Sequence, residues 1–84
     1  MGSFDNLVAV ITGGGSGMGG AVAAQLRAGG ARVALFDLDP GAPADGVLPV
    51  TADVADRASL DRAAAQVDAA WGGIDILVNS AGIS

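Results

Sequence analysis

Six of the eight residues from Gly13 to Gly20 are glycines, and they directly follow the apolar run VAVIT. Glycine costs about 1 kcal/mol relative to alanine inside a helix and also weakens strands. One explanation is that a buried strand passes into a helix here. A pyrophosphate can then approach the bare backbone and bind the outward N–H groups of the first helical turn, and it needs no lysine side chain. The alternative is a tight turn that packs the helix on the strand. Gly15, Gly17 and Gly20 also fit the G-x-G-x-x-G spacing.

An acid stands at a suitable distance from this glycine cluster. Asp37 follows Gly20 by 17 residues and ends a second apolar run, ARVALFD. At about this offset a carboxylate accepts hydrogen bonds from the ribose hydroxyls of NAD. The same carboxylate repels the 2′-phosphate of NADP, and no arginine follows it in DLDPG to compensate. The alternative is that Asp37 only starts the turn completed by Asp39-Pro40-Gly41.

The residue types that the chain lacks restrict its chemistry. It contains no Cys, His, Lys, Tyr or Glu, so thiolate chemistry, disulfides and zinc-finger sites are excluded and the usual general base at pH 7 is missing. We therefore predict no catalytic residue and no metal site. Nine Asp against four Arg give a net charge of −5, which argues against nucleic acid or an anionic membrane as a partner.

The sequence shows neither a membrane span nor a targeting segment. No apolar run approaches the roughly 18 residues that a span needs, and no basic leader with a cleavage site opens the chain. The expectation is a cytoplasmic protein. The 84 residues, of which 51% are hydrophobic, suffice for one small folded domain.

Strands and helices alternate along the chain. Continuous apolar runs predict strands covered on both faces, and apolar residues at helical spacing predict helices. This alternation predicts an α/β fold, namely the N-terminal half of a doubly wound parallel (Rossmann) sheet with strand order 3-2-1-4. Residues 1–84 would then form a partial dinucleotide-binding domain. Strands are expected at residues 7–12, 31–37, 47–52 and 74–80, and helices at 18–28 and 56–71.

The second helix has the clearest sequence pattern. Asp56 is placed to cap its start, and Gly72 and Gly73 are placed to end it. Apolar side chains at helical spacing form one stripe for the core. The stripe consists of Leu60, Ala64, Val67 and Trp71.

The link between the second and third strands is short. Its nine residues, 38–46, fall below the 10–12 that a crossover with its own helix normally needs. We therefore expect an irregular loop or a single turn there. Pro49 lacks a ladder donor, which suggests that the third strand lies at an edge of the sheet.

Two other classes of nucleotide-binding protein carry a glycine-rich turn. A P-loop requires G-x-x-x-x-G-K-[ST], and a chain without lysine cannot form it. An S-adenosylmethionine-binding domain has a glycine-rich turn and an acid after the second strand. Its glycines normally follow an acidic residue, whereas Thr12 stands at that place here. This class is kept as a minor alternative.

Three short motifs resemble those of one family. TGGGSGMG resembles the TGxxxGxG signature of the short-chain dehydrogenase/reductase family, with Thr12, Gly13, Gly17 and Gly19 at the signature positions. ADV at 52–54 is similar to that family's adenine-contact motif. VNSAG at 78–82 is similar to its NNAG motif, in which Ser80 replaces the second Asn. The motifs occur in the family's order, and the resemblance covers essentially the whole chain.

The resemblance implies a set of residues that bind the cofactor NAD. The glycine-rich segment would lie against the pyrophosphate and the neighbouring ribose, and the NNAG-like segment along the adenosine. Asp53 would meet the adenine amino group, and Val54 would contribute backbone. Asp37 and the uncharged Ser16 both favour NAD over NADP. The expected residues are Gly13, Ser16, Gly17, Met18, Gly19, Asp37, Asp53, Val54, Asn79, Ser80, Ala81 and Gly82.

The resemblance also implies an activity for a complete protein. Hydride would pass between NAD(H) and an alcohol or carbonyl, and FDL, DVAD and VNSAGI are most similar to the branch of 3-hydroxyacyl-CoA dehydrogenases and 3-oxoacyl reductases. The substrate would be a small alcohol or ketone or an acyl thioester, and the complete protein a homo-oligomer. The family's catalytic Ser and Tyr-x-x-x-Lys would lie beyond Ser84, so this chain would be the cofactor-binding half of an oxidoreductase acting on CH–OH groups.

Two further functions remain open at this point. The chain could be a dinucleotide-binding module without catalysis, or a truncated remnant that acts by association. In the expected strand order, the apolar strand 74–80 is an unpaired edge. Such an edge predicts pairing with another chain or aggregation.

Overall fold

The computed structural model describes residues 3–13 and 17–80 and contains every element expected from the sequence. The ends of these elements differ from the expected ones by at most two residues. The strands are β1 (Val8–Thr12), β2 (Arg32–Asp37), β3 (Val47–Thr51) and β4 (Ile76–Asn79), and the helices are α1 (Gly17–Ala28) and α2 (Arg57–Trp71).

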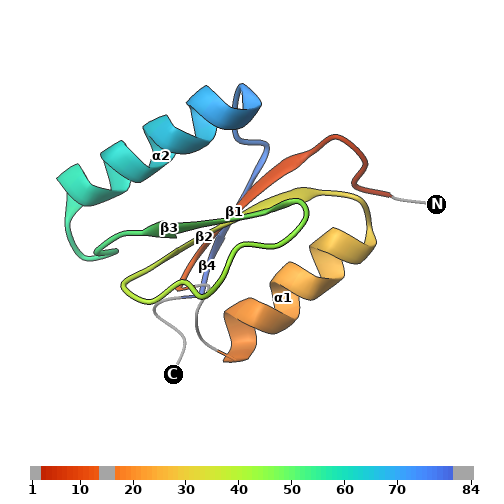
Figure 1. The fold of residues 1–84 in the computed structure, drawn as a ribbon, viewed down its shortest axis with the longest axis horizontal. Coiled ribbons are helices and arrows are strands. Elements are labelled where there is room, and N and C mark those ends of the chain that lie inside the picture. The colour runs from red at the N-terminus through yellow and green to blue at the C-terminus, as the bar shows by residue number, and fades with distance from the viewer. Residues whose placement is uncertain (1–2, 14–16, 81–84) are drawn as a thin grey trace.

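The four strands form one parallel sheet in the order β3-β2-β1-β4, as the alternation of strands and helices predicts. β1 lies in the interior of the sheet, where Val10 is paired with Ala34 of β2 on one side and with Leu77 of β4 on the other. Helix α1 covers one face and α2 the other (Figure 1). The protein therefore has three layers, and the two middle strands are covered on both sides.

Alternate residues of the strands face the two helices. On the α2 face, Val10 and Phe36 belong to a cluster that includes Val67 of the helix. On the α1 face, Ile11 and Val33 belong to a second cluster that includes Leu26. All five residues of β1 are buried, which explains why its sequence is continuously apolar up to Thr12.

Helix α2 begins and ends where the sequence indicates. The carboxylate of Asp56 accepts a hydrogen bond from the Ala58 N–H at 3.0 Å, so Asp56 is its N-cap. Gly72 ends the helix in the left-handed conformation with φ of +80°, and its N–H donates to the Asp68 carbonyl. Glycine adopts this conformation without the steric cost that other residues have.

The buried stripe of α2 differs from the expected one at one position. Ala63 and Val67 are fully buried, while Leu60 and Trp71 are half-buried against the same cluster. Ala64, which the sequence places in the stripe, is half-buried and not fully enclosed. An α-helix has 3.6 residues per turn, so the third or the fourth residue along the chain can face the sheet. Here the third residue after Leu60, Ala63, is the one that is fully buried.

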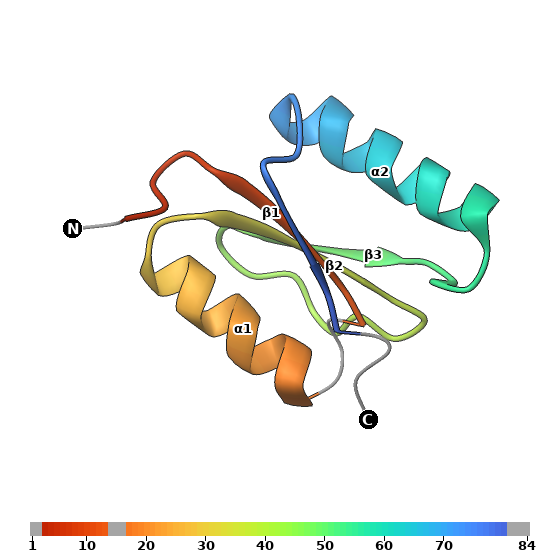
Figure 2. The ribbon, with the colours of Figure 1, turned by 180° about the vertical axis from the view of Figure 1, so that it is seen from behind.

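The short link between β2 and β3 contains no helix, as its length predicts. It closes through a bridge between Ala44 and Val47. Strand β3, which carries Pro49, lies at one edge of the sheet. β4 lies at the other edge, beside β1 (Figure 2), and its Leu77 side chain is 68% exposed. No described helix is long and apolar enough to cross a membrane.

Candidate functional site

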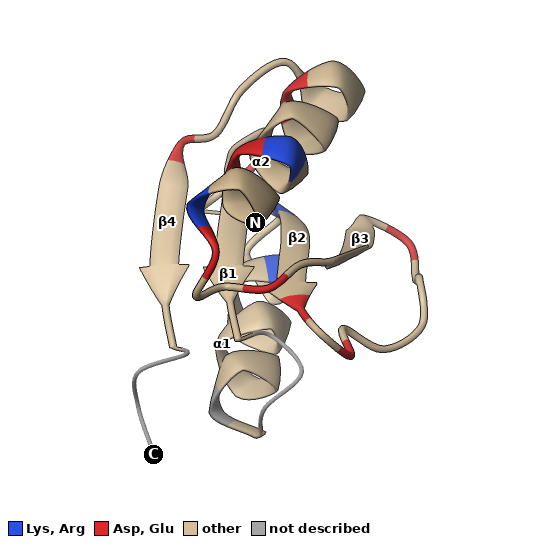
Figure 3. Ribbon diagram, turned by 90° about the vertical axis from the view of Figure 1, so that its left-hand side faces the viewer, with Lys and Arg blue, Asp and Glu red and all other residues tan. Residues whose placement is uncertain are grey.

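The expected site residues lie after the carboxyl ends of the strands. Because all four strands are parallel, these ends share one edge of the sheet. Figure 3 shows the arrowheads of β1, β2 and β4 at the same end, with an acidic residue at the end of β2. Gly13 follows β1, Asp37 ends β2, Asp53 follows β3 and Asn79 ends β4. The fold thus brings together residues that are far apart in the sequence, as open α/β sheets do at their ligand-binding edge.

Gly13 marks the point at which the chain leaves β1. It has φ of +74°, and its N–H donates to the Phe36 carbonyl of β2 at 2.7 Å. This left-handed conformation is open to glycine at no steric cost and disfavours other residues. It ends the strand directly before the segment that leads into α1.

The first turn of α1 has open space around two of its glycines, Gly17 and Gly20. A Cβ atom built on Gly17 or Gly20 would have no described atom within 4 Å. Close packing against the described residues therefore does not explain these two glycines. No acidic residue stands in the first turn of α1, so its positive end is not neutralised from within the helix. Gly19, by contrast, is buried.

Asp37 serves the turn that follows β2. Its carboxylate accepts a hydrogen bond from the Asp39 N–H at 3.1 Å, which is the turn role considered as an alternative. Asp37 is half-buried, and its own backbone carbonyl accepts from the Ala52 N–H at 2.8 Å. The turn holds the carboxylate at the carboxyl edge. A carboxylate has two oxygens with several acceptor positions.

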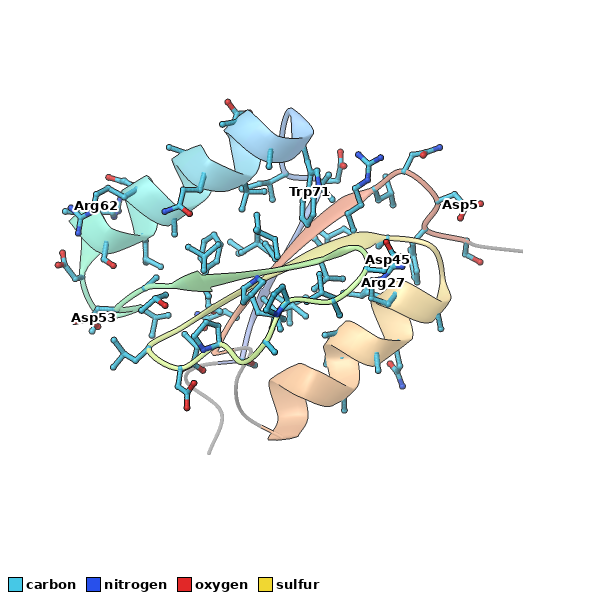
Figure 4. All side chains as sticks on the ribbon, viewed as in Figure 1. Asp5, Arg27, Asp45, Asp53, Arg62 and Trp71 are labelled. Carbon is cyan, nitrogen blue, oxygen red and sulfur yellow. The ribbon has the colours of Figure 1, made fainter. Side chains whose placement is uncertain are left out.

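Asp53 and Val54 connect β3 to α2. The Asp53 carboxylate accepts from the Ala55 N–H at 3.0 Å, and the Asp53 N–H donates to the Ser59 hydroxyl at 2.9 Å. Asp53 is exposed, and Val54 packs against the core cluster under α2. In Figure 4 Asp53 lies at the opposite end of the molecule from Asp5 and Asp45.

Asn79 and Ser80 end β4 next to the glycine-rich segment. The Thr12 hydroxyl donates to the Asn79 side-chain oxygen at 2.9 Å, which leaves the amide NH2 of the exposed Asn79 as a donor group at this edge. The Ser80 hydroxyl faces inward and donates to the Thr12 carbonyl at 2.7 Å. Sequence reasoning missed the Thr12–Asn79 contact. The sequence feature that could have indicated this contact is Thr12, the hydroxyl residue at the end of an otherwise apolar strand.

Part of the expected site cannot be placed. Ser16, Ala81 and Gly82 lie outside the described residues, as does the side chain of Met18. Among residues 3–13 and 17–80, no group of three or more Asp side chains could hold a metal ion. The residues that are placed include two carboxylates and one side-chain amide, groups that can form hydrogen bonds with a nucleotide.

Comparison with known proteins decides the family. The model of the short chain dehydrogenase family matches residues 7–84. The chain belongs to this family. A relative from Sphingomonas sp. (strain SKA58), a 2-dehydro-3-deoxy-L-rhamnonate dehydrogenase (NAD(+)), is 43% identical, and the match covers 99% of this chain and 36% of the relative. D-threitol dehydrogenase from Mycolicibacterium smegmatis (strain ATCC 700084 / mc(2)155) is 42% identical over 96% of this chain and 35% of its own length.

Solved structures of short-chain dehydrogenases share the fold. The 3-ketoacyl-(acyl-carrier-protein) reductase from Brucella melitensis, whose structure is complexed with NADH, superposes with a TM-score of 0.80 at 35% identity, over 89% of this chain and 34% of that protein. The chain thus spans about a third of the length of the relatives it matches. The family's general oxidoreductase function and its parallel α/β sheet both agree with the expectations from the sequence.

Proposed function

We propose that this chain forms the part of an NAD-dependent short-chain dehydrogenase that binds the adenosine and pyrophosphate of the cofactor. The observation that carries the proposal is the open start of α1 at the same edge of the sheet as Asp37. A pyrophosphate can approach the backbone there, because no side chain would be displaced at Gly17 or Gly20. NAD, when bound, supplies the nicotinamide ring that accepts or donates the hydride.

The preference for NAD over NADP is assigned to Asp37. Its carboxylate would accept hydrogen bonds from the ribose hydroxyls, and it would repel a phosphate on the 2′ oxygen. Ser16, which precedes the second signature glycine, brings no positive charge to offset that repulsion. The relative whose name includes NAD(+) and the neighbour complexed with NADH support the same choice.

The other residues of the expected set receive the following roles. Asp53 and Val54 would meet the adenine, and Asn79 would offer its side-chain amide donors along the adenosine. Gly13, Gly17 and Gly19 would form the pyrophosphate side together with Ser16 and Met18. Ser80, Ala81 and Gly82 complete the proposed set.

The reaction proposed for the complete protein is hydride transfer between NAD(H) and an alcohol or carbonyl compound. The names of the relatives span a sugar acid, a polyol and an acyl thioester. We therefore propose the general class of CH–OH substrates, with 3-hydroxyacyl thioesters as one member. Substrate-binding and proton-transferring groups are assigned to the part of the relatives' length that this chain does not span.

Paired titrations of the chain with NADH and NADPH test the proposal. Asp37→Ala removes the ribose acceptor, and hydrogen bonds to charged groups contribute about 1.5–3 kcal/mol. NADH should therefore bind roughly 10- to 100-fold more weakly, since 1.4 kcal/mol corresponds to a factor of ten. The preference for NADH over NADPH should fall by at least about tenfold, because the repulsion of the 2′-phosphate disappears as well.

Two further variants separate the ribose contact from the turn. Asp37→Asn retains an oxygen that can accept from the Asp39 N–H, so it should lose selectivity while keeping the turn. Asp39→Asn removes a neighbouring exposed carboxylate and should leave the selectivity within twofold of the wild type. Unchanged selectivity in both Asp37 variants would remove this residue from the ribose site.

A further inference from the structure

The sheet has two edges, and the outer side of β3 is already occupied. The Ala52 N–H donates to a carbonyl of β2 at 2.8 Å. Because alternate residues of a strand turn their main-chain groups to opposite sides, Val47 and Pro49 turn theirs away from β2. There Val47 exchanges hydrogen bonds with Ala44 at 3.0 and 3.5 Å, and Pro49 has no N–H to donate. A further strand therefore finds few partners along β3.

The outer side of β4 carries main-chain groups with no described strand beside them. The Ser80 N–H donates to the Thr12 carbonyl of β1 at 3.0 Å, so the even-numbered residues of β4 face β1, and Leu77 and Asn79 face outward. In the part of the chain that the structure describes, β4 is the last strand on this side of the sheet (Figure 3). An edge of this kind is a template for pairing with another strand.

Leu77 adds an exposed apolar side chain to this edge. It pairs with Val10, which belongs to the cluster on the α2 face, and paired residues of neighbouring strands share a face. Helix α2 packs on β2 and β3, so Leu77, on the far side of β1, remains 68% exposed. Its neighbours Ile76 and Val78 pack against the cluster on the α1 face. β4 is thus covered on one face and open on the other face and along its outer side.

We propose that the outer side of β4 binds a second copy of this chain, with the two β4 strands antiparallel around a twofold axis perpendicular to the sheet. Leu77 of each copy then exchanges both main-chain hydrogen bonds with Leu77 of the other, with their Cα atoms about 5.5 Å apart. The two leucine side chains lie on the same face and cover each other. The two sheets join into one. This interaction goes beyond the proposed function and does not depend on it.

The distribution of charge favours the antiparallel arrangement. β4 has no charged residue, although each chain carries a net charge of −5. In the proposed register Asp75 lies opposite Asn79 of the second copy, so the two Asp75 residues are about 13 Å apart along the strands. Salt screens charges beyond about 10 Å at 0.1 M ionic strength. Parallel pairing would bring both Asp75 residues to the same end and, because one copy must be turned over, would place the two leucines on opposite faces.

Sedimentation equilibrium over a wide range of concentration tests the interaction. β4 has four residues, so we expect a reversible dimer and not a permanent one. Leu77→Lys removes the apolar contact and places two like charges opposite each other, so it should raise the dissociation constant at least about tenfold. Leu38→Lys is the matched control, because Leu38 is 70% exposed in the link between β2 and β3. It should leave the dissociation constant within about twofold of the wild type. A wild type that stays monomeric at millimolar concentration would overturn the proposal, as would equal effects of the two variants.

An introduced cysteine tests the register. The chain contains no Cys, so Leu77→Cys carries a single thiol. In the proposed register the two Cα atoms lie within the roughly 4.4–6.8 Å that a disulfide bridges. Under mild oxidation, Leu77→Cys should form covalent dimers at least about tenfold faster than the equally exposed Leu38→Cys, because pairing raises the effective concentration of its thiol. Equal rates for the two variants would refute the register.

Hydrogen exchange of the unaltered chain distinguishes a second copy from another occupant of this edge. The Leu77 N–H should exchange more slowly as the protein concentration rises, because the second copy supplies its acceptor. The Ser80 N–H, which is bonded to the Thr12 carbonyl, should depend on concentration far less. Slow exchange of the Leu77 N–H at every concentration would show that a segment of the same molecule covers the edge, and it would overturn the proposal.

Discussion

Asp75 joins the beginning of β1 to the segment that enters β4. Its carboxylate accepts a hydrogen bond from the Val8 N–H at 2.9 Å, and its own N–H donates to the Val8 carbonyl at 2.8 Å. Val8 is 4% exposed, so water cannot easily replace a lost partner. Asp75→Ala removes the acceptor and leaves this backbone donor unsatisfied.

The expected cost follows from these contacts. An unsatisfied buried donor costs about 1–3 kcal/mol, and we place Asp75→Ala in the lower half of this range because Asp75 itself is exposed. A domain of 84 residues has a total stability of roughly 4–13 kcal/mol on the usual scale per residue. A loss of 1–2 kcal/mol lowers the melting temperature by about 4–15 °C for a domain of this size.

Urea unfolding followed by Trp71 fluorescence measures the effect. Trp71 is the one tryptophan of the chain, and its half-buried ring packs against the core cluster below α2 (Figure 4). Asp75→Asn keeps an oxygen acceptor and should lose less than half as much stability. Asp61→Ala, an exposed position on α2, should stay within about 0.5 kcal/mol of the wild type. A free energy of unfolding for Asp75→Ala within that same margin would refute the reasoning.

Two further outcomes are expected. In urea unfolding, Gly20→Ala should stabilise the chain by up to about 1 kcal/mol, because Gly20 lies in α1 with open space around a Cβ. Gly72→Ala should destabilise the chain by about 1 kcal/mol, because φ of Gly72 is +80°. Equal effects of the two changes would contradict this expectation. Light scattering should show that the chain self-associates through β4, and Leu77→Lys should reduce the association, since Leu77 is 68% exposed on an edge strand. A monodisperse wild-type monomer would contradict the second expectation.

Much of the fold could be predicted because burial leaves a local pattern in the sequence. Continuous apolar runs marked β1 and β2, and Asp56 and Gly72 marked the ends of α2. The alternation of strands and helices then fixed a parallel sheet and its strand order. That Ala63, and not Ala64, is the fully buried alanine of α2 could not be predicted, because the side of α2 that meets the sheet depends on the angle at which the helix packs.

The placement of candidate residues at one edge could also be predicted, since parallel strands bring their carboxyl ends together. The contacts among them could not. The hydrogen bonds from Thr12 to Asn79 and from Ser80 to Thr12 join residues 67 and 68 positions apart. They depend on the register between β1 and β4, which no local pattern encodes. Periodicity likewise gave no sign that Asp53 also accepts from the Ala55 N–H.

The position of β1 between β2 and β4 has a consequence for folding. Val8 pairs with Arg32 across 24 residues, but Ala9 pairs with Ile76 across 67 residues. The entropy of loop closure makes the second pairing costlier by about 0.9 kcal/mol when each loop closes from the open chain. The β1–β2 pair should therefore form early and the β1–β4 seam late. Contacts that form after the transition state mainly slow unfolding, so the bonds of Asp75 and Ser80 would set how long the folded chain lasts and have little influence on how fast it forms.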